Sequence, residues 1–147
     1  MDAAHIHLIF CHIPIVGAVF TILLILFGIF MKSKDLKIVS LWFSVIVGLF
    51  SVLAYVTGDG AAEIAKKTSG ITESIIEPHE EWALYYFIFL IVIGVISFIA
   101  LYLSRTSAEM LHKFVIIILV LTILSSVIAF ETAYTGAKIR HTEIQLK

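Results

Sequence analysis

Histidines are the residues of this chain best suited to chemistry, because imidazole is the commonest protein ligand for transition metals and a frequent ligand of haem iron. A single histidine is most often an interfacial or capping residue. Of the six in the chain, only His112 falls at the inner end of the membrane topology that the charges predict. The other five fall at the outer end and are His5, His7, His12, His79 and His141. Their clustering predicts a ligand set near the outer face.

Two classes of cofactor suit such a set. Histidines from different helices of a bundle, with aromatic and aliphatic side chains around them, are typical of a bis-histidine haem b. Three histidines with Glu77, Glu80 or Glu81 beside them would equally suit zinc or copper. A covalent c-type haem is excluded by the usual motif, since C-x-x-C-H is absent and Cys11 is the single cysteine.

Composition excludes a soluble globular enzyme. Of the 147 residues, 61% are apolar and 14% are charged, against roughly 45–50% and about 25% in soluble domains. Mean hydropathy is +1.08. The 10 Lys and Arg are balanced by 11 Asp and Glu, which leaves no basic surface for nucleic acid. We therefore expect one membrane domain, residues 1–147, in contact with the lipid bilayer.

Four apolar runs are long enough to cross about 30 Å of hydrocarbon as helices. The predicted spans are residues 8–31, 38–57, 82–104 and 114–133, the last free of charge as far as Phe130. Short connections make consecutive helices antiparallel neighbours. The predicted fold class is an all-α integral membrane protein, an antiparallel up-and-down bundle of four transmembrane helices. An outer loop is expected at residues 58–81.

Local signals refine this plan. A short interfacial helix is predicted from Asp59 to Lys67, inside the long loop. The helix that contains the third span is expected to begin near Glu77, ahead of the apolar run, with Pro78 in its first turn and acidic residues near the positive end of its dipole. Pro14 either opens the first helix at its first turn or kinks it.

Basic residues predict the orientation. The two short connections carry five of them, Lys32, Lys34, Lys37, Arg105 and Lys113. Because positively charged loops stay in the cytoplasm, both termini and the long loop are expected to face outward. A bacterial inner membrane is the expected location.

Depth can be counted from these basic anchors at about 1.5 Å per residue. The deeper predicted layer holds His12, Glu131 and Tyr134. The upper layer holds His7, His79 and His141. An ideal helix turns His7 and His12 about 140° apart, so these two need not serve one site.

The predicted axial ligands are His79 and one of His7, His12 or His141. Depth favours His141 as the partner of His79, whereas a position inside the apolar bundle favours His12. Two further residues are assigned to the site: Arg140 as a partner of haem propionates, and Glu131 as an acid at the edge of the lipid. With Tyr134, Glu131 is a candidate for a quinol or proton-relay site.

The opening His7 and His12, spaced H-x4-H-x-P up to Pro14, resemble the start of a bacterial family of small four-helix membrane proteins of unknown function. That family has a proline where this chain has Leu8. It also has a histidine that opens the third span, matched here by His79.

A Gly-Gly…His signature follows the fourth span in that family. This chain has Gly136 and His141 at the corresponding places, with Ala137 in place of the second glycine. The resemblance covers essentially the whole chain and supports His7, His12, His79 and His141 as the positions of interest. It implies a redox or haem-associated role in the membrane.

The leading hypothesis is a small membrane protein similar to a b-type cytochrome, which transfers electrons to or from a membrane or periplasmic redox partner, with quinol as one candidate. An electron-transfer or accessory subunit fits the chain better than a stand-alone enzyme. The alternatives are a non-catalytic accessory subunit of a larger membrane complex and a protein that binds zinc or copper.

Overall fold

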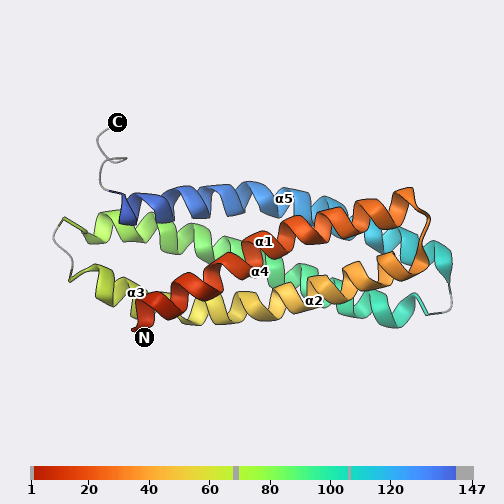
Figure 1. The fold of residues 1–147 in the computed structure, drawn as a ribbon, viewed down its shortest axis with the longest axis horizontal. Coiled ribbons are helices and arrows are strands. Elements are labelled where there is room, and N and C mark those ends of the chain that lie inside the picture. Colours follow the sequence, from red (N-terminus) through yellow and green to blue (C-terminus); the bar gives the residue numbers. More distant parts are fainter. Residues whose placement is uncertain (1, 68–69, 106, 142–147) are drawn as a thin grey trace.

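The computed structural model describes residues 2–67, 70–105 and 107–141, almost all of which are helical (Figure 1). The helices are α1 (Ala3–Phe30), α2 (Lys34–Val56), α3 (Gly58–Ala65), α4 (Glu73–Leu103) and α5 (Ala108–Arg140). No strand occurs in these three stretches, so the predicted all-α class is confirmed.

The four long helices form an antiparallel bundle. Tight turns join α1 to α2 and α4 to α5 at one end, which we call the short-loop end (Figure 1). The opposite end, called the α3 end, holds α3, the start of α1 and the end of α5. α1 packs along α2, α2 along α4 and α4 along α5, while α1 meets α5 less extensively. The predicted up-and-down topology is confirmed.

Each of the four helices is long and apolar enough to cross a membrane. Large apolar side chains point away from the bundle along their length, including Phe20, Leu49, Phe98 and Val127. A surface of this kind is stable against lipid and unstable against water. The chain has the architecture of an integral membrane protein.

Hydroxyl and carboxylate caps begin three of these helices. Asp2 accepts the main-chain N–H of His5 at 3.0 Å, and this bond lowers the pKa of the Asp2 carboxyl. Ser33 and Ser107 accept in the same way from residues three positions ahead, at 3.3 and 3.2 Å. Each cap satisfies an amide that the first turn of a helix leaves without a partner.

At the α3 end the helices run beyond the predicted spans. α1 begins at Ala3 and not at residue 8, and α5 continues to Arg140 and not to residue 133. The predicted ends of the spans were placed where the run of apolar residues stops. A helix satisfies its own backbone groups, however, so polar residues continue it outside the hydrocarbon.

The start of α4 was also predicted too late. α4 begins at Glu73, so Pro78 lies inside the helix and not in its first turn. Pro14 likewise lies inside α1 and does not open it. The short helix predicted in the long loop is present as α3. An ion pair of 2.6 Å between Lys66 and Glu73 links the end of α3 to the start of α4, and it raises the pKa of Lys66.

Small residues let α2 and α4 touch at the middle of the bundle. A Cβ atom on Gly48 would lie 3.1 Å from the carbonyl oxygen of Leu90 and 3.4 Å from the Cα of Gly94. Buried hydroxyls beside this crossing bond to their own helix, as Ser44 and Ser51 do at 2.8 and 2.6 Å. Close backbone approach of this kind holds helices together in lipid, where no hydrophobic force does.

Candidate functional site

His7 lies half-buried on α1, against the last turn of α2. Its Nδ1 is 3.1 Å from the carbonyl oxygen of Ala54 and 3.2 Å from the hydroxyl oxygen of Thr57. A carbonyl oxygen only accepts, so Nδ1 carries the hydrogen and donates it. In the neutral imidazole the lone pair is therefore on Nε2.

His79 has the same arrangement in the other half of the bundle. This half-buried side chain of α4 lies against α5, with Nδ1 3.0 Å from the carbonyl oxygen of Thr132 and 3.4 Å from the hydroxyl oxygen of Thr135. Again Nδ1 is the donor, which leaves the lone pair of the neutral ring on Nε2.

A glycine follows the threonine in both places. A Cβ on Gly136 would lie 3.0 Å from Cε1 and 3.1 Å from Nδ1 of His79, so the imidazole rests directly against the backbone of α5. The matching Cβ on Gly58 would lie 3.8 Å from Cε1 of His7, which is ordinary contact. Only a residue without a side chain leaves the space that the His79 ring occupies.

The two histidine environments are thus related as two halves of the chain. α1 and α2 form one helical hairpin, and α4 and α5 form the other. In each hairpin the first helix supplies a histidine, and the second supplies a carbonyl oxygen and a threonine three residues later. Thr57-Gly58 and Thr135-Gly136 are the two Thr-Gly dipeptides of the sequence. The α3 end therefore presents two matched imidazoles.

A hydrogen bond lower in the bundle relates the two helices that carry these histidines. The hydroxyl of Tyr86, buried on α4, donates to the carbonyl oxygen of Pro14 on α1 at 3.2 Å. His7 precedes Pro14 by seven residues, and His79 precedes Tyr86 by seven. Seven residues make nearly two helical turns. Each histidine is therefore rotated only about 20° around its helix from the residue that forms the Tyr86–Pro14 bond. It lies about 10 Å nearer the α3 end. α1 and α4 run in the same direction, so the histidines share one level.

Neither Nε2 atom of the matched pair has a hydrogen-bond partner among the described residues. Two imidazole lone pairs on facing helices, each held in one tautomer, can bind a Lewis acid between them.

His12 and His141 lie outside this pair. The exposed ring of His12 approaches the carbonyl oxygen of Leu8 at 2.6 Å through Nδ1, on its own helix. His141 is exposed just after α5, where its main-chain N–H caps Ala137 at 2.8 Å.

The other predicted site residues lie on α5. Glu131 is half-buried, and its carbonyl oxygen accepts the hydroxyl of Thr135 at 2.8 Å. Tyr134 is exposed, stacks on Phe130 and lies under the ammonium of Lys138, 4.3 Å from the ring centre. That environment is typical of the membrane interface. Arg140 is the exposed last residue of α5.

Metal binding by a cluster of protein ligands finds no support in the part of the chain that the structure describes. Nowhere in residues 2–67, 70–105 and 107–141 do three His, Cys, Asp or Glu side chains gather closely enough to hold a metal ion. Among the four predicted ligands, His7 and His79 share one hydrogen-bond pattern.

The hydroxyl residues beside the two histidines were missed by sequence reasoning. Thr57, Thr132 and Thr135 are small residues near helix ends, where they look like ordinary membrane packing. Gly136 stood out only through the family resemblance, and its contact with His79 was not predicted. The repeated Thr-Gly dipeptide was the available signal. It is too short to be recognised as a repeat without knowing that both copies face a histidine.

Comparisons with protein-family models, with curated proteins and with solved structures find no match to this chain. The resemblance to the bacterial four-helix family stays a prediction.

Proposed function

We propose that this protein is a small b-type cytochrome of the membrane, in which His7 and His79 would hold a haem b. The observation that carries the proposal is the matched donation of Nδ1–H to a carbonyl oxygen of the neighbouring helix, at 3.1 and 3.0 Å. Such a bond orients a ligating imidazole and makes its Nε2 more basic.

The number of ligands supports haem over zinc or copper. Zinc takes three or four protein ligands, and copper sites in proteins commonly use three or more. Haem takes two, because the porphyrin nitrogens occupy the remaining positions. The matched imidazoles of His7 and His79 would supply these two ligands, and no group of three or more candidate ligands occurs among the described residues.

The environment of the two rings also suits the proposal. The Gly136 position leaves room for the His79 ring against α5, and the Tyr86 bond to Pro14 ties the two ligand-bearing helices together. Bound haem would supply a one-electron carrier. The protein's part would be to hold each imidazole in the tautomer that leaves the lone pair on Nε2.

Other residues of the α3 end have secondary roles in the proposal. Arg140 ends α5 at this end and is the candidate partner for propionate groups. Glu131 is the candidate proton acceptor for a quinol partner, and Tyr134 is the candidate aromatic residue beside it. A redox partner in the membrane or the periplasm would exchange electrons at this end.

Orientation is part of the same proposal. Five basic residues at the short-loop end support a cytoplasmic position for that end, and hence an outward-facing α3 end with both termini. The membrane proposed is the bacterial inner membrane.

The test is an absorption spectrum of the purified protein in detergent, after expression with haem precursor supplied. A Soret band with the sharp visible bands of a low-spin reduced haem is expected. His7→Ala and His79→Ala should each lose the low-spin form. His12→Ala and His112→Ala, which alter exposed histidines, are the matched controls and should keep it.

Two results would contradict the proposal. One is a folded protein, monodisperse in detergent, without a Soret band when haem is available. The other is a low-spin spectrum that survives both His7→Ala and His79→Ala. Elemental analysis of the same sample separates the alternatives, because stoichiometric zinc or copper without haem favours a metal protein. A folded protein with neither cofactor favours an accessory subunit.

A further inference from the structure

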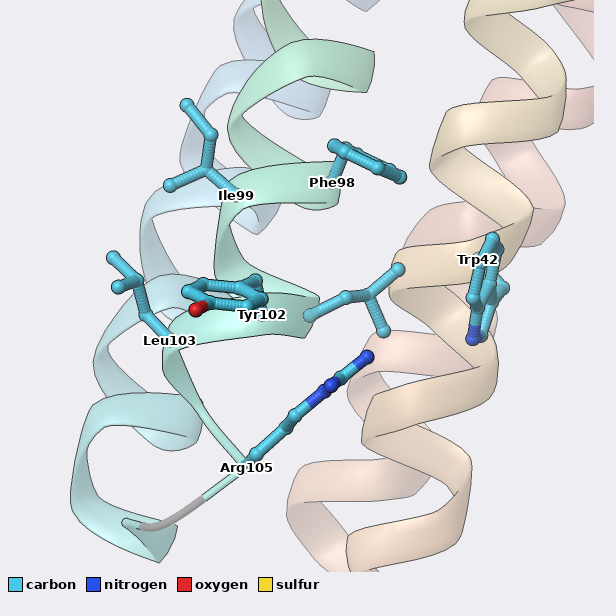
Figure 2. A pocket seen from close by; sticks show the side chains of 7 residues that line it. Trp42, Phe98, Ile99, Tyr102, Leu103 and Arg105 are labelled. Carbon is cyan, nitrogen blue, oxygen red and sulfur yellow. The ribbon is translucent and has the colours of Figure 1, made fainter.

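An apolar groove lies between α2 and α4 at the short-loop end, at the opposite end of the bundle from His7 and His79. It measures about 290 Å³ and opens to the side of the bundle. Its lining is one basic residue among aromatic and aliphatic ones, Trp42, Phe98, Ile99, Leu101, Tyr102, Leu103 and Arg105. Figure 2 shows the Arg105 side chain crossing the mouth of the groove from the end of α4 toward Trp42. The groove thus has an apolar body and a cationic rim.

Arg105 is available to an anion. Its guanidinium lies 5.5 Å from the ring centre of Tyr102, a cation–π contact that neutralises no charge. None of the ion pairs in the part of the chain described here includes Arg105. Lys113 at the same end differs, because its ammonium is paired with Glu109 at 2.7 Å.

A second donor faces the same place. The indole nitrogen of Trp42 lies on the side of its ring nearest the Arg105 guanidinium (Figure 2). Trp42 is half exposed and Tyr102 is 68% exposed, so both rings face the lipid. An indole N–H only donates. A planar guanidinium and an indole N–H that line the same groove are donors suited to phosphate oxygens.

The short-loop end as a whole carries a net positive charge, which suits an anionic ligand. Its basic side chains are Lys32, Lys34, Lys37, Arg105 and Lys113, against the two acidic side chains Asp35 and Glu109. A net positive surface at the level of the headgroups attracts anionic lipids.

We propose that this groove binds one anionic phospholipid from the adjoining leaflet. Arg105 and the Trp42 indole N–H bind its phosphate, and Phe98, Ile99 and Leu103 line the path of an acyl chain. A soluble phosphate ester would use the rim alone and leave the apolar body facing lipid. A zwitterionic lipid would bring its own cation next to Arg105. The two features together therefore favour an anionic lipid.

Fluorescence quenching tests this directly, because the chain has two tryptophans and Trp42 lines the groove. Trp82→Phe leaves Trp42 as the single tryptophan. This variant is reconstituted in vesicles that contain dibrominated phosphatidylglycerol or dibrominated phosphatidylcholine, whose bromine atoms quench a tryptophan in contact with their chains. Quenching is measured as the brominated fraction of the vesicle lipid is raised. Its dependence on that fraction gives the binding constant of each lipid relative to the other.

We expect phosphatidylglycerol to bind about tenfold more strongly than phosphatidylcholine, as one charge-assisted hydrogen-bonded contact allows. Arg105→Gln in the same background should bring the ratio close to one. Lys34→Gln removes an exposed charge at the same end but outside the groove, and should leave the ratio nearly unchanged.

The proposal is overturned if both lipids quench equally in the Trp82→Phe protein, or if Lys34→Gln lowers the ratio as much as Arg105→Gln does. The second result would mean general attraction to the charged end. The proposal is also overturned if inorganic phosphate at millimolar concentration abolishes the preference for phosphatidylglycerol over phosphatidylcholine. The rim would then bind phosphate without the lipid. Circular dichroism confirms that each variant is folded.

Discussion

The hydroxyl of Tyr86 donates a hydrogen bond to the main-chain carbonyl oxygen of Pro14 at 3.2 Å, and so joins α4 to α1 across the interior of the bundle. Tyr86 is 6% exposed, so no water competes for this bond. The contact sets the rotation of both helices. Two turns nearer the α3 end, the same faces carry His7 and His79.

Tyr86→Phe is expected to destabilise the protein by about 1 kcal/mol, the usual value of one buried hydrogen bond. It should also broaden or weaken any haem spectrum, because the two ligand-bearing helices lose the bond that sets their rotation. Thermal unfolding in detergent and the absorption spectrum measure the two effects.

The matched control is Tyr85→Phe, which removes an exposed hydroxyl bond to Glu81 of 2.9 Å on the same helix. It should change neither measurement. Equal effects of Tyr85→Phe and Tyr86→Phe would mean that the bond to Pro14 has no special role.

The fold could be predicted largely because four charge-free runs admit few arrangements. A run of some 20 apolar residues must span the membrane as a helix, and short connections leave neighbouring helices antiparallel. The ends of the helices could not be predicted in this way. Glu73 and Arg140 lie in helices because backbone bonding continues beyond the lipid, where side-chain polarity no longer marks a boundary.

The site was predictable as a set of residues but not as a pair. His7 and His79 stand out by type and depth. Which side chains face each other depends on the rotation of each helix, and continuously apolar helices carry almost no sign of it. The contact of Tyr86 with Pro14 indicates which faces of α4 and α1 are turned toward each other. It joins residues that are 72 positions apart, and nothing in their local sequences indicates the pairing.

Gly136→Ala should destabilise the protein by roughly 1–3 kcal/mol, the usual cost of an added methyl in a packed site. The new Cβ would lie 3.0 Å from Cε1 of His79 and would push the ring away from Thr132. Elsewhere in a helix, replacing glycine by alanine usually raises the stability of the protein. Chemical or thermal unfolding in detergent shows whether Gly136→Ala lowers or raises the free energy of unfolding.

Gly58→Ala is the control for that substitution, since its Cβ would meet the His7 ring at an ordinary 3.8 Å. It should be neutral or stabilising. A stabilising Gly136→Ala would show that the His79 ring does not depend on the space beside α5.

Gly48→Ala should separate α2 from α4 and lower the unfolding temperature. Its Cβ would lie 3.1 Å from the carbonyl oxygen of Leu90, a main-chain atom that cannot turn aside. Gly94→Ala is the matched control on the facing helix, because its nearest neighbour would be 3.6 Å away. Both proteins are compared by thermal unfolding in the same detergent. If both substitutions lowered the unfolding temperature equally, the close contact of α2 with α4 would not be centred on Gly48.

Acidification should release the haem of the proposed site. A ligating Nε2 must be unprotonated, while Nδ1 of both His7 and His79 already carries its hydrogen for Ala54 and Thr132. A proton can therefore add only at Nε2, where it competes with iron. The low-spin spectrum is expected to be complete at neutral and mildly alkaline pH, and to be lost as the pH falls. Spectra recorded down a pH series, with circular dichroism on the same samples, separate ligand release from unfolding. A low-spin spectrum unchanged until the helices themselves unfold would mean that neither imidazole of this pair binds the iron.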